Sequence, residues 1–307
     1  MGNHQEPIIY SKPLEGTKED GFSHIYRNAK YMDRVYETPH ENYKNIRDVF
    51  IDACLTKYKN NDFLGKMTLN SVEVDGETKD ERSLTKYSYS HIFHLAENVG
   101  TFLLNRKMEH QEKLLNMKVV GIFSKNRYEW IVVDFICVLY GLTSVPLYDT
   151  LGIENLSFCL NNSEITTLFC SEQTVQTILK LKNLGNLKNI ICFDSLSPEA
   201  EGELKEKKLE VFYFSEAMKK PEEVADYRKY PIDRETILTF SYTSGTTGPP
   251  KGAMISHGNF LGFLAAFVNG DGGIWRTDDV YLSFLPLPHI FERIVITSML
   301  YSGAFVA

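Results

Sequence analysis

The chain has 307 residues, of which 43% are hydrophobic and 24% are charged, and its formal net charge is −7. This balance is typical of a globular protein with a substantial core, and it argues against extensive disorder. Because the surface of an acidic chain with a pI near 5.7 lacks the basic character that phosphate neutralisation requires, we expect no nucleic-acid partner.

Residues 1–44 are polar, rich in Tyr, His and acidic residues, and without sustained periodicity, so they predict an irregular N-terminal arm. Gly2 alone is no myristoylation signal, because Glu6 stands where that signal needs Ser or Thr, and no apolar signal-peptide region follows. The longest apolar run, residues 130–142, contains Asp134 and is too short to cross a bilayer. We therefore expect a cytoplasmic protein, with peripheral contact at the endoplasmic reticulum or another organelle membrane as the alternative.

The pattern changes at Asn45, where a helical periodicity begins, and a second, longer helix is predicted over residues 90–106. The segment between them contains Asp75 and Gly76 and many charges, which favours strands joined by exposed turns. The apolar faces of the two helices consist of Ile46, Val49, Phe50, Ala53 and Cys54 in the first and of Ile92, Leu95, Ala96, Val99 and Leu103 in the second.

From Lys118 onward, short runs rich in β-forming residues alternate with helical stretches, and no internal repeat is present. Such alternation predicts an α/β fold with a parallel sheet covered by helices on both faces. The predicted strands are 119–124, 144–148, 166–170, 189–193 and 210–214, and the predicted helices are 128–140, 154–161, 174–184 and 199–207.

Five cysteines are spread along the chain without a CxxC pair, so neither a disulfide framework nor a zinc site is predicted. We interpret them as small apolar core residues in a reducing compartment.

The segment richest in chemical information is 237–256, which reads ILTFSYTSGTTGPPKGAMIS. Its residues 243–252 contain three Gly, two Pro, four hydroxyl side chains and one Lys. Glycines let backbone N–H groups turn inward, hydroxyls add donors, and Lys251 adds a positive charge, so this loop is predicted to hold a polyphosphate. It is not a Walker A loop, because the GxxxxGK[ST] spacing is absent and a β-prone run follows Lys251. We expect a glycine-rich hairpin between two strands, with a flexible surface turn as the plain alternative.

The run YTSGTTGPPKG resembles the signature of the adenylate-forming superfamily, which includes acyl-CoA synthetases, luciferases and peptide-synthetase adenylation domains. The resemblance implies that Lys251 follows the phosphates through the reaction and that Thr243 helps to hold Mg2+. The residues that it implies around the ATP phosphates are Thr243, Ser244, Gly245, Thr246, Thr247, Gly248 and Lys251.

A second motif, VYLSFLPLPHIFER, covers residues 280–293 and predicts a strand that ends at Pro286 and presents His289 beyond its carboxyl end. A lone His is more often structural than catalytic. Because it lies downstream of the phosphate loop, however, the motif resembles the family segment beside the acyl carboxylate. The resemblance makes His289, with Lys251, the candidate catalytic pair. His289 would orient the carboxylate. For Glu292 and Arg293, a local ion pair is the first interpretation.

Three further stretches, VGIFSKNRYEWIVVDFIC, SVPLYDTLGIENLSFCLNNSE and LSFLPLPHIFER, are similar to eukaryotic long-chain acyl-CoA synthetases, and the resemblance covers residues 86–307. The apolar face formed by Phe260, Phe263, Leu264 and Phe267 fits core packing first and an acyl tunnel second. For Trp275 we place an exposed turn aromatic ahead of a tunnel gate.

The resemblance also implies parts that cannot be placed in these residues, namely a Mg2+-binding Glu, a ribose-binding Asp, a hinge and a small C-terminal domain with a catalytic Lys. The final run SMLYSGAFVA has no helix stop or polar tail, so we expect residues 45–307 to be an incomplete AMP-binding domain without catalytic turnover of its own. In the complete enzyme, the resemblance implies that ATP and a long-chain fatty acid give acyl-AMP and pyrophosphate, and that CoA then displaces AMP.

Two alternatives remain open at this point. One is a ligase of the same superfamily for an aryl acid or an amino acid. The other is a short, non-catalytic protein that binds ATP or a fatty acid, or that partners a full-length enzyme. The sequence predicts neither the oligomeric state nor the preferred acyl chain length.

Overall fold

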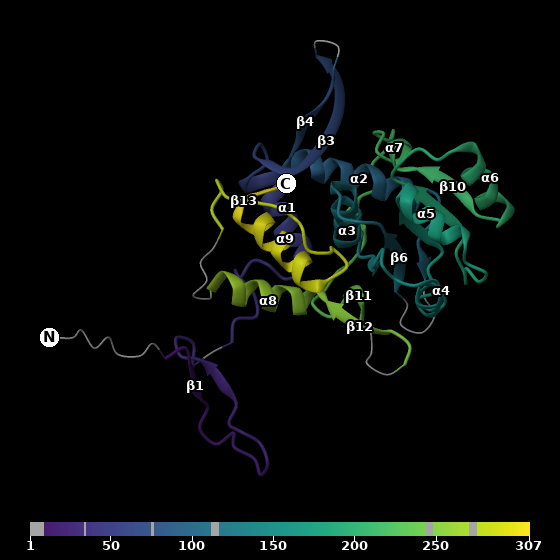
Figure 1. Ribbon diagram of the computed structural model, residues 1–307. Coiled ribbons are helices and arrows are strands. Elements are labelled where there is room, and N and C mark those ends of the chain that lie inside the picture. The colour runs from purple at the N-terminus through teal and green to yellow at the C-terminus, as the bar shows by residue number, and fades with distance from the viewer. Residues whose placement is uncertain (1–8, 34, 75–76, 112–116, 244–247, 270–274) are drawn as a thin grey trace. The chain divides into compact units, whose positions relative to one another are not determined.

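The computed structural model describes residues 9–33, 35–74, 77–111, 117–243, 248–269 and 275–307. The chain forms two compact units, Met1–Glu37 and Thr38–Ala307. In the first unit, β1 (Ser11–Pro13) pairs antiparallel with β2 (Tyr26–Asn28), so the segment predicted as an irregular arm contains a short two-stranded ribbon (Figure 1). Everything described below lies in the second unit.

An eight-stranded sheet dominates the second unit. Its strands are β5 (His110–Gln111), β6 (Lys118–Phe123), β7 (Thr143–Leu147), β8 (Thr167–Cys170), β9 (Asn189–Cys192), β10 (Glu210–Tyr213), β11 (Ile237–Thr243) and β12 (Lys251–Ser256). The order is β10-β9-β8-β6-β7-β11-β12, and β5 pairs with β6. All neighbours from β10 to β11 are parallel, whereas β12 and β5 are antiparallel to their partners.

Both faces of this sheet are buried, as the alternation along β6 shows. Val119 and Phe123 contribute to one hydrophobic cluster, and Val120 and Ile122 contribute to the other. The first cluster includes α4 (Ile153–Asn162), α5 (Glu172–Leu179) and α6 (Pro198–Glu206), and the second includes α2 (Tyr89–Asn105) and α3 (Tyr128–Tyr140). The predicted α/β fold with helices on both faces is therefore confirmed.

The predicted elements from 118 to 213 are present, with ends shifted by few residues. The main difference is the helix expected over 174–184, which begins at Glu172 and ends at Leu179. The residues after it form turns, in which the side chain of Asn183 accepts a hydrogen bond from the backbone N–H of Gly185.

A second, four-stranded sheet has the order β13-β14-β3-β4. Its strands are β3 (Asp62–Val74), β4 (Glu77–Ser88), β13 (Val280–Tyr281) and β14 (Phe305–Val306). β3 and β4 form a long antiparallel hairpin, one end of which extends away from the neighbouring helices (Figure 1). The strands expected between the first two helices are therefore confirmed.

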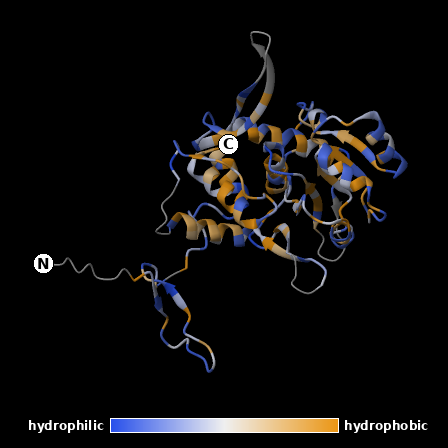
Figure 2. Cartoon of the chain, in the orientation of Figure 1, coloured by the Kyte–Doolittle hydropathy of each residue, from blue (hydrophilic) through white to orange (hydrophobic). Residues whose placement is uncertain are grey.

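The remaining described helical segments of this part are α1 (Ile46–Ile51), a π-helical turn (Asp52–Lys57), α8 (His257–Asn269) and α9 (Ile290–Ser302). α9 contacts β14 of this sheet and also α1 and α8, and α8 contacts β12 of the large sheet. Figure 2 shows hydrophobic residues along α8, α9 and the strands of the large sheet. Close approach of α2 and α3 depends on Gly100, because a Cβ there would collide with the ring of Tyr140. Among the described helices, none combines the length and the apolar composition needed to cross a membrane.

The strand predicted over 280–286 is wrong beyond its first two residues. Only Val280–Tyr281 pairs with β14, and the rest of the segment has no regular structure. Pro286 and Pro288 lack the N–H groups that a ladder needs. Leu282 and Phe284 are 66% and 71% exposed, so the apolar pattern here does not mark a buried strand.

His257, the first residue of α8, is fully buried, and among the described residues neither ring nitrogen has a hydrogen-bond partner. Burial, followed by the positive charge of Arg47, lowers the pKa of His257 to about 3. The folded protein therefore keeps this imidazole neutral under conditions in which the unfolded chain binds a proton.

We expect this histidine to make the fold acid-sensitive. Between its usual pKa of 6.5 and about 3, the unfolded chain binds more protons, so the free energy of unfolding falls as the pH falls. At pH 5 this loss reaches about 2 kcal/mol, since one pKa unit corresponds to ~1.4 kcal/mol. Urea unfolding at several pH values measures this dependence. In His257→Phe, the free energy of unfolding should change less steeply with pH between pH 5 and 6.5 than in the parent chain.

Phe260→Leu is the control for this experiment, because it trims another buried side chain of α8 without removing a titratable group. It should lower stability at every pH and leave the slope as in the parent chain. A parent slope that His257→Phe does not reduce would contradict the assignment to His257.

Candidate functional site

The predicted phosphate loop lies between two antiparallel strands, which confirms the hairpin interpretation. Thr243, the last residue of β11, pairs with Lys251, the first residue of β12, and Tyr242 pairs with Gly252. The buried Tyr242 donates a hydrogen bond of 2.7 Å to the side chain of Asn162 in α4. A Cβ at Gly252 would lie 3.3 Å from the Tyr242 ring, so this glycine lets the two strands approach at the base of the loop.

Three of the seven predicted ATP-binding residues lie in the described part of the chain, and Ser244, Gly245, Thr246 and Thr247 lie outside it. Thr243 and Lys251 are exposed, and the Thr243 hydroxyl donates a hydrogen bond to the Lys251 carbonyl oxygen. No ion pair joins Lys251 to a described residue, so its ammonium group is available to an anion. Gly248 has a φ of +112°, a conformation that favours glycine.

His289 occupies the N-cap position of α9, where its side chain is exposed. Its Nδ1 atom accepts a hydrogen bond of 3.1 Å from the backbone N–H of Phe291. Because Nδ1 is the acceptor, the neutral ring carries its proton on Nε2. The cap therefore leaves one N–H donor of His289 available to a ligand.

The predicted local ion pair between Glu292 and Arg293 is wrong. Glu292 is fully buried and accepts hydrogen bonds of 2.6 Å from the hydroxyls of Tyr281 and Ser283. Arg293 forms a buried ion pair with Asp134 of α3, with 3.0 Å between Nε and Oδ2. Successive residues on a helix do not face each other, so neither side chain turns toward the other.

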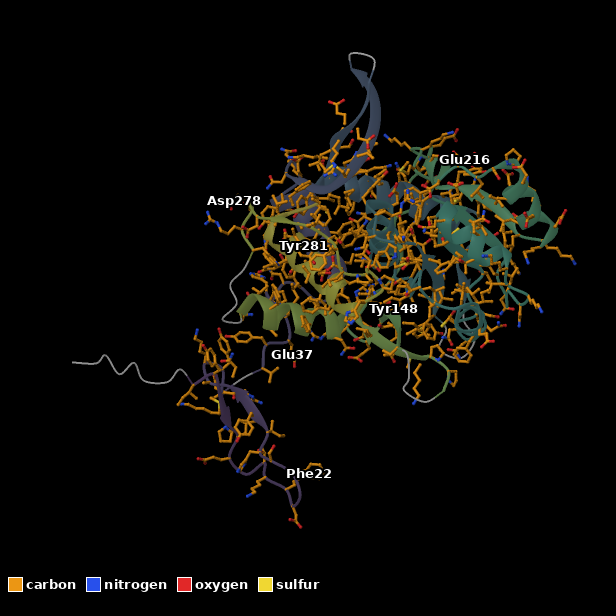
Figure 3. All side chains as sticks on the ribbon, in the orientation of Figure 1. Phe22, Glu37, Tyr148, Glu216, Asp278 and Tyr281 are labelled. Atoms are coloured by element: carbon orange, nitrogen blue, oxygen red, sulfur yellow. The ribbon has the colours of Figure 1, made fainter. Side chains whose placement is uncertain are left out.

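The carboxylate of Glu292 also orders the chain before α9. Burial, together with the hydrogen bond to Glu292, raises the pKa of Tyr281. Figure 3 shows the Tyr281 side chain among the densely packed side chains around α9. These contacts make Glu292 a structural residue of this segment.

Trp275 is half-buried, so the interpretation as an exposed turn aromatic is wrong. Its Nε1–H donates a hydrogen bond of 2.7 Å to the Ser298 hydroxyl, and its ring stacks on Phe267 at 6.1 Å between centroids. Phe260 and Leu264 are buried, which confirms core packing for these two residues of α8. Phe263, in contrast, is 43% exposed.

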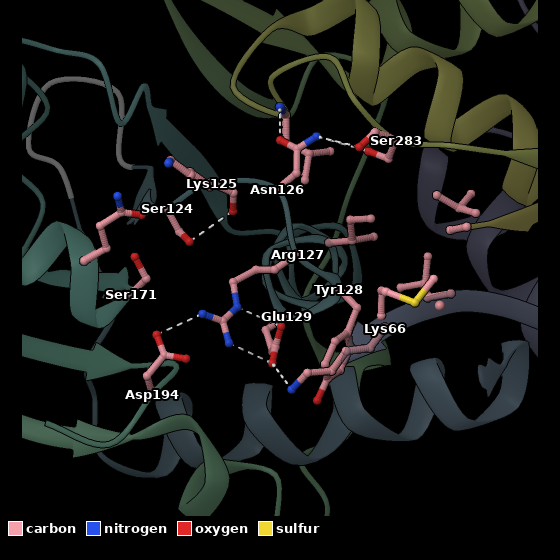
Figure 4. A pocket seen from close by; sticks show the side chains of 18 of the residues that line it. Lys66, Ser124, Lys125, Asn126, Arg127, Tyr128, Glu129, Ser171, Asp194 and Ser283 are labelled. Carbon is pink, nitrogen blue, oxygen red and sulfur yellow. Dashed lines mark hydrogen bonds and ion pairs between the residues drawn. The ribbon is translucent and has the colours of Figure 1, made fainter. Parts of the chain in front are cut away.

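A cavity of about 560 Å³ lies at the carboxyl ends of β6, β8 and β9 (Figure 4). β6 is the strand from which the sheet grows in both directions, with β7 on one side and β8 on the other. Open α/β sheets bind ligands at this kind of reversal point. The walls combine polar residues after the strands with apolar residues of β3, β14 and the segment before α9. Its described lining includes Ser283 and Leu287 but neither His289 nor Lys251.

The guanidinium of Arg127 is the main charge in this cavity, and two carboxylates neutralise it (Figure 4). It lies 2.8 Å from Glu129 and 2.9 Å from Asp194. Burial alone would lower the pKa of Arg127, but its hydrogen bonds and charge contacts with these carboxylates outweigh burial and raise it. Lys66 approaches Glu129 at 3.8 Å. The cavity is therefore close to charge balance and does not resemble a polyphosphate site.

Sequence reasoning missed this cavity, although a signal was present. Ser124, Ser171 and Asp194 are polar residues placed directly after, or one residue beyond, the buried strands β6, β8 and β9. Parallel strands bring such positions together at one edge of a sheet. Within the described part of the chain, no hydrogen bond or ion pair joins His289 to Thr243 or Lys251, so their joint role stays a prediction.

Residues 73–307 match the protein family described as AMP-binding enzyme. The chain belongs to this AMP-binding family. The match begins inside β3 and includes both the phosphate-loop hairpin and the His289 segment. The family-level resemblance stated from the sequence is thereby confirmed.

Among curated relatives, "Fatty acyl-CoA synthetase B" of Dictyostelium discoideum is 41% identical over 61% of this AMP-binding chain and 28% of its own length. "Long chain acyl-CoA synthetase 4" of Arabidopsis thaliana is 30% identical over 92% of this chain and 41% of its own length. The chain thus spans less than half the length of these relatives.

Among solved structures, the A domain of carboxylic acid reductase from Segniliparus rugosus, in complex with AMP and a co-purified carboxylic acid, matches with a TM-score of 0.66. The match is 19% identical and covers 88% of this chain and 46% of that one. At this identity the similarity shows the fold, and it agrees with the adenylation-domain architecture of the AMP-binding family.

The described residues offer limited support for a metal ion. They contain no group of three or more His, Cys, Asp or Glu side chains that could hold one. The exposed hydroxyl of Thr243 supplies one hard oxygen at the end of β11. Mg2+ typically binds through one or two protein oxygens, with water and substrate phosphates completing its shell, so Thr243 fits as one such ligand.

Proposed function

We propose that the protein takes part in ATP-dependent activation of long-chain fatty acids to acyl-CoA through an acyl-adenylate. The observation that carries the proposal is the similarity, at 30% identity over 92% of the chain, to a relative named for long-chain acyl-CoA synthesis. The exposed Lys251 at the mouth of a glycine-rich hairpin supports it, because such a hairpin can hold phosphates.

The proposed reaction has two displacements. A carboxylate oxygen of the fatty acid attacks the α-phosphorus of ATP, the bond to the bridging oxygen breaks, and pyrophosphate leaves. The thiolate of CoA then attacks the acyl carbon and releases AMP. Lys251 places its ammonium beside the β and γ phosphates, where charge accumulates as pyrophosphate departs. Mg2+, when bound with ATP, would supply further positive charge beside these oxygens, with Thr243 as one ligand.

His289 is proposed to orient the acyl carboxylate. Its Nδ1 atom is occupied by the helix cap, so Nε2–H is the free donor and can hold one carboxylate oxygen. This leaves the second oxygen for attack. A ring fixed by the first turn of α9 also loses little rotational freedom when the substrate binds.

Acid-dependent exchange of pyrophosphate into ATP tests this function. The native protein should be captured from its source cells with an antibody against residues 188–230, sized by immunoblot and then assayed. We expect exchange with palmitate well above that with coumarate or with amino acids. Preference for either of those acids would reject the long-chain assignment in favour of another acid ligase.

The same capture separates the non-catalytic alternative. A single band at 35.2 kDa, the mass of this chain, without exchange for any acid would favour a protein that binds ATP or a fatty acid without turnover. A larger band with palmitate-dependent exchange would support the ligase. Cell fractionation of the same lysate tests the proposed cytoplasmic location against attachment to an organelle membrane.

A further inference from the structure

The segment 283–287, which leads into the cap of α9, has no strand or helix to satisfy its backbone groups. Neither Pro286 nor the following Pro288 has an N–H group. One polar contact comes from the second sheet, where Ser283 donates its backbone N–H to the carbonyl oxygen of Ala307 at 3.0 Å. The Ser283 hydroxyl donates to Glu292. Three further backbone groups of the segment find their partner in another part of the chain.

Asn126, in the turn between β6 and α3, supplies these partners with a single side chain (Figure 4). Its Nδ2 donates to the carbonyl oxygen of Leu285 at 2.6 Å and lies within 3.3 Å of both oxygens of Ser283. Its Oδ1 accepts the backbone N–H of Leu287 at 2.9 Å. The donors and the acceptor of this one amide are thus all used, across separations of 157 to 161 positions.

The segment 283–287, clamped by Asn126, is directly connected to His289. The backbone N–H of His289 donates to the carbonyl oxygen of Pro286 at 2.9 Å. The cap residue is thus hydrogen-bonded to the residue that lies between Leu285 and Leu287, the two leucines that Asn126 holds. Leu287 is 1% exposed and fixes the other end of this turn in the core. A shift of the clamped segment would therefore move the His289 ring.

We propose that Asn126 is a positioning residue for His289. Its amide is committed to Ser283, Leu285 and Leu287, so it acts on the substrate through the His289 segment and not by direct contact. The catalytic consequence rests on the proposed acyl-activating function, whereas the mechanical consequence does not. Side-chain hydrogen bonds of this kind fix a loop whose backbone groups have no partners in a helix or strand.

Hydrogen exchange in this chain tests the mechanical part. In Asn126→Ala the Leu287 N–H loses its acceptor, and its exchange should become at least ~10-fold faster, together with that of His289. Asn126→Asp keeps an acceptor for Leu287 but loses the donors to Leu285 and Ser283. Its exchange rates should therefore fall between those of the parent and those of Asn126→Ala. Asn98→Ala is the matched control, because the half-buried Asn98 side chain donates one long-range hydrogen bond to the carbonyl oxygen of Met218.

The catalytic part is tested by pyrophosphate exchange in the protein expressed from its native gene. Asn126→Ala should reduce palmitate-dependent exchange ~10- to 100-fold, and Asn98→Ala should leave it near the parent. Added to His289→Ala, the Asn126 substitution should cost little more, because both act through one group.

Unchanged exchange of Leu287 and His289 in Asn126→Ala would overturn the proposal. Fully additive losses in the double variant would also overturn it, since a merely structural residue lowers activity independently of His289. Should the native parent show no pyrophosphate exchange, the proposed function fails, and hydrogen exchange alone then decides whether Asn126 positions this segment.

Discussion

Replacing Lys251 by Ala should reduce acid-dependent pyrophosphate exchange by at least ~100-fold in the protein expressed from its native gene, because one preorganised charge at a transition state is worth about 10²–10³ in rate. Lys251 is exposed at the first position of β12 and forms no ion pair with a described residue. Its ammonium group therefore has little function in the fold. The loss should appear in kcat more than in the KM for the fatty acid, because the charge matters most as pyrophosphate leaves.

Lys182→Ala is the control, since Lys182 is also exposed but lies in the turn after α5 and is not part of the hairpin. It should leave the exchange rate within about twofold of the parent, as expected for a surface substitution. Lys251→Arg keeps the charge with a different geometry, so its exchange rate should fall between those of the parent and of Lys251→Ala. A Lys251→Ala protein that exchanges pyrophosphate as fast as the parent would reject the role of the hairpin in phosphate binding.

The large sheet could be predicted from sequence because its strands are short, apolar and separated by amphipathic helices. α3 is the clearest case, since Tyr128–Tyr140 agrees with the predicted range and ends at Gly141, whose φ of +66° is a common helix stop. The hairpin could be predicted as well, because the β-prone run after Lys251 excluded a Walker A helix.

The strand predicted before His289 was wrong because its structure depends on distant contacts and not on the local pattern. Its alternating apolar residues resemble a strand, but two prolines prevent a ladder, and Asn126 from a distant turn provides the contacts instead. Periodicity describes neighbours in sequence, whereas this segment is held by a side chain 161 positions away. The same limitation hid the cavity beside Arg127, whose walls come from several separate strand ends.

The partner of Arg293 was also beyond local reasoning, because Asp134 lies 159 positions away in α3. The Arg293 side chain is 1% exposed. Its guanidinium also donates to the Ser144 hydroxyl, while its Nη1 has no partner among the described residues. Arg293→Met removes the positive charge that pairs with the Asp134 carboxylate, and so leaves this carboxylate unpaired in a largely buried site. We expect the free energy of unfolding in urea to fall by about 3–5 kcal/mol.

Arg293→Met combined with Asp134→Leu should recover most of this loss, because apolar residues of similar volume avoid the cost of burying an unpaired charge. The exposed pair Arg276 and Asp278 is the matched control, with side chains that are 77% and 71% exposed. Solvent screens that pair, so Arg276→Ala should change stability by less than about 1 kcal/mol. If Arg293→Met costs no more than Arg276→Ala, the carboxylate of Asp134 must reach water or a proton in the folded state, and the pair does not fasten α9 to α3.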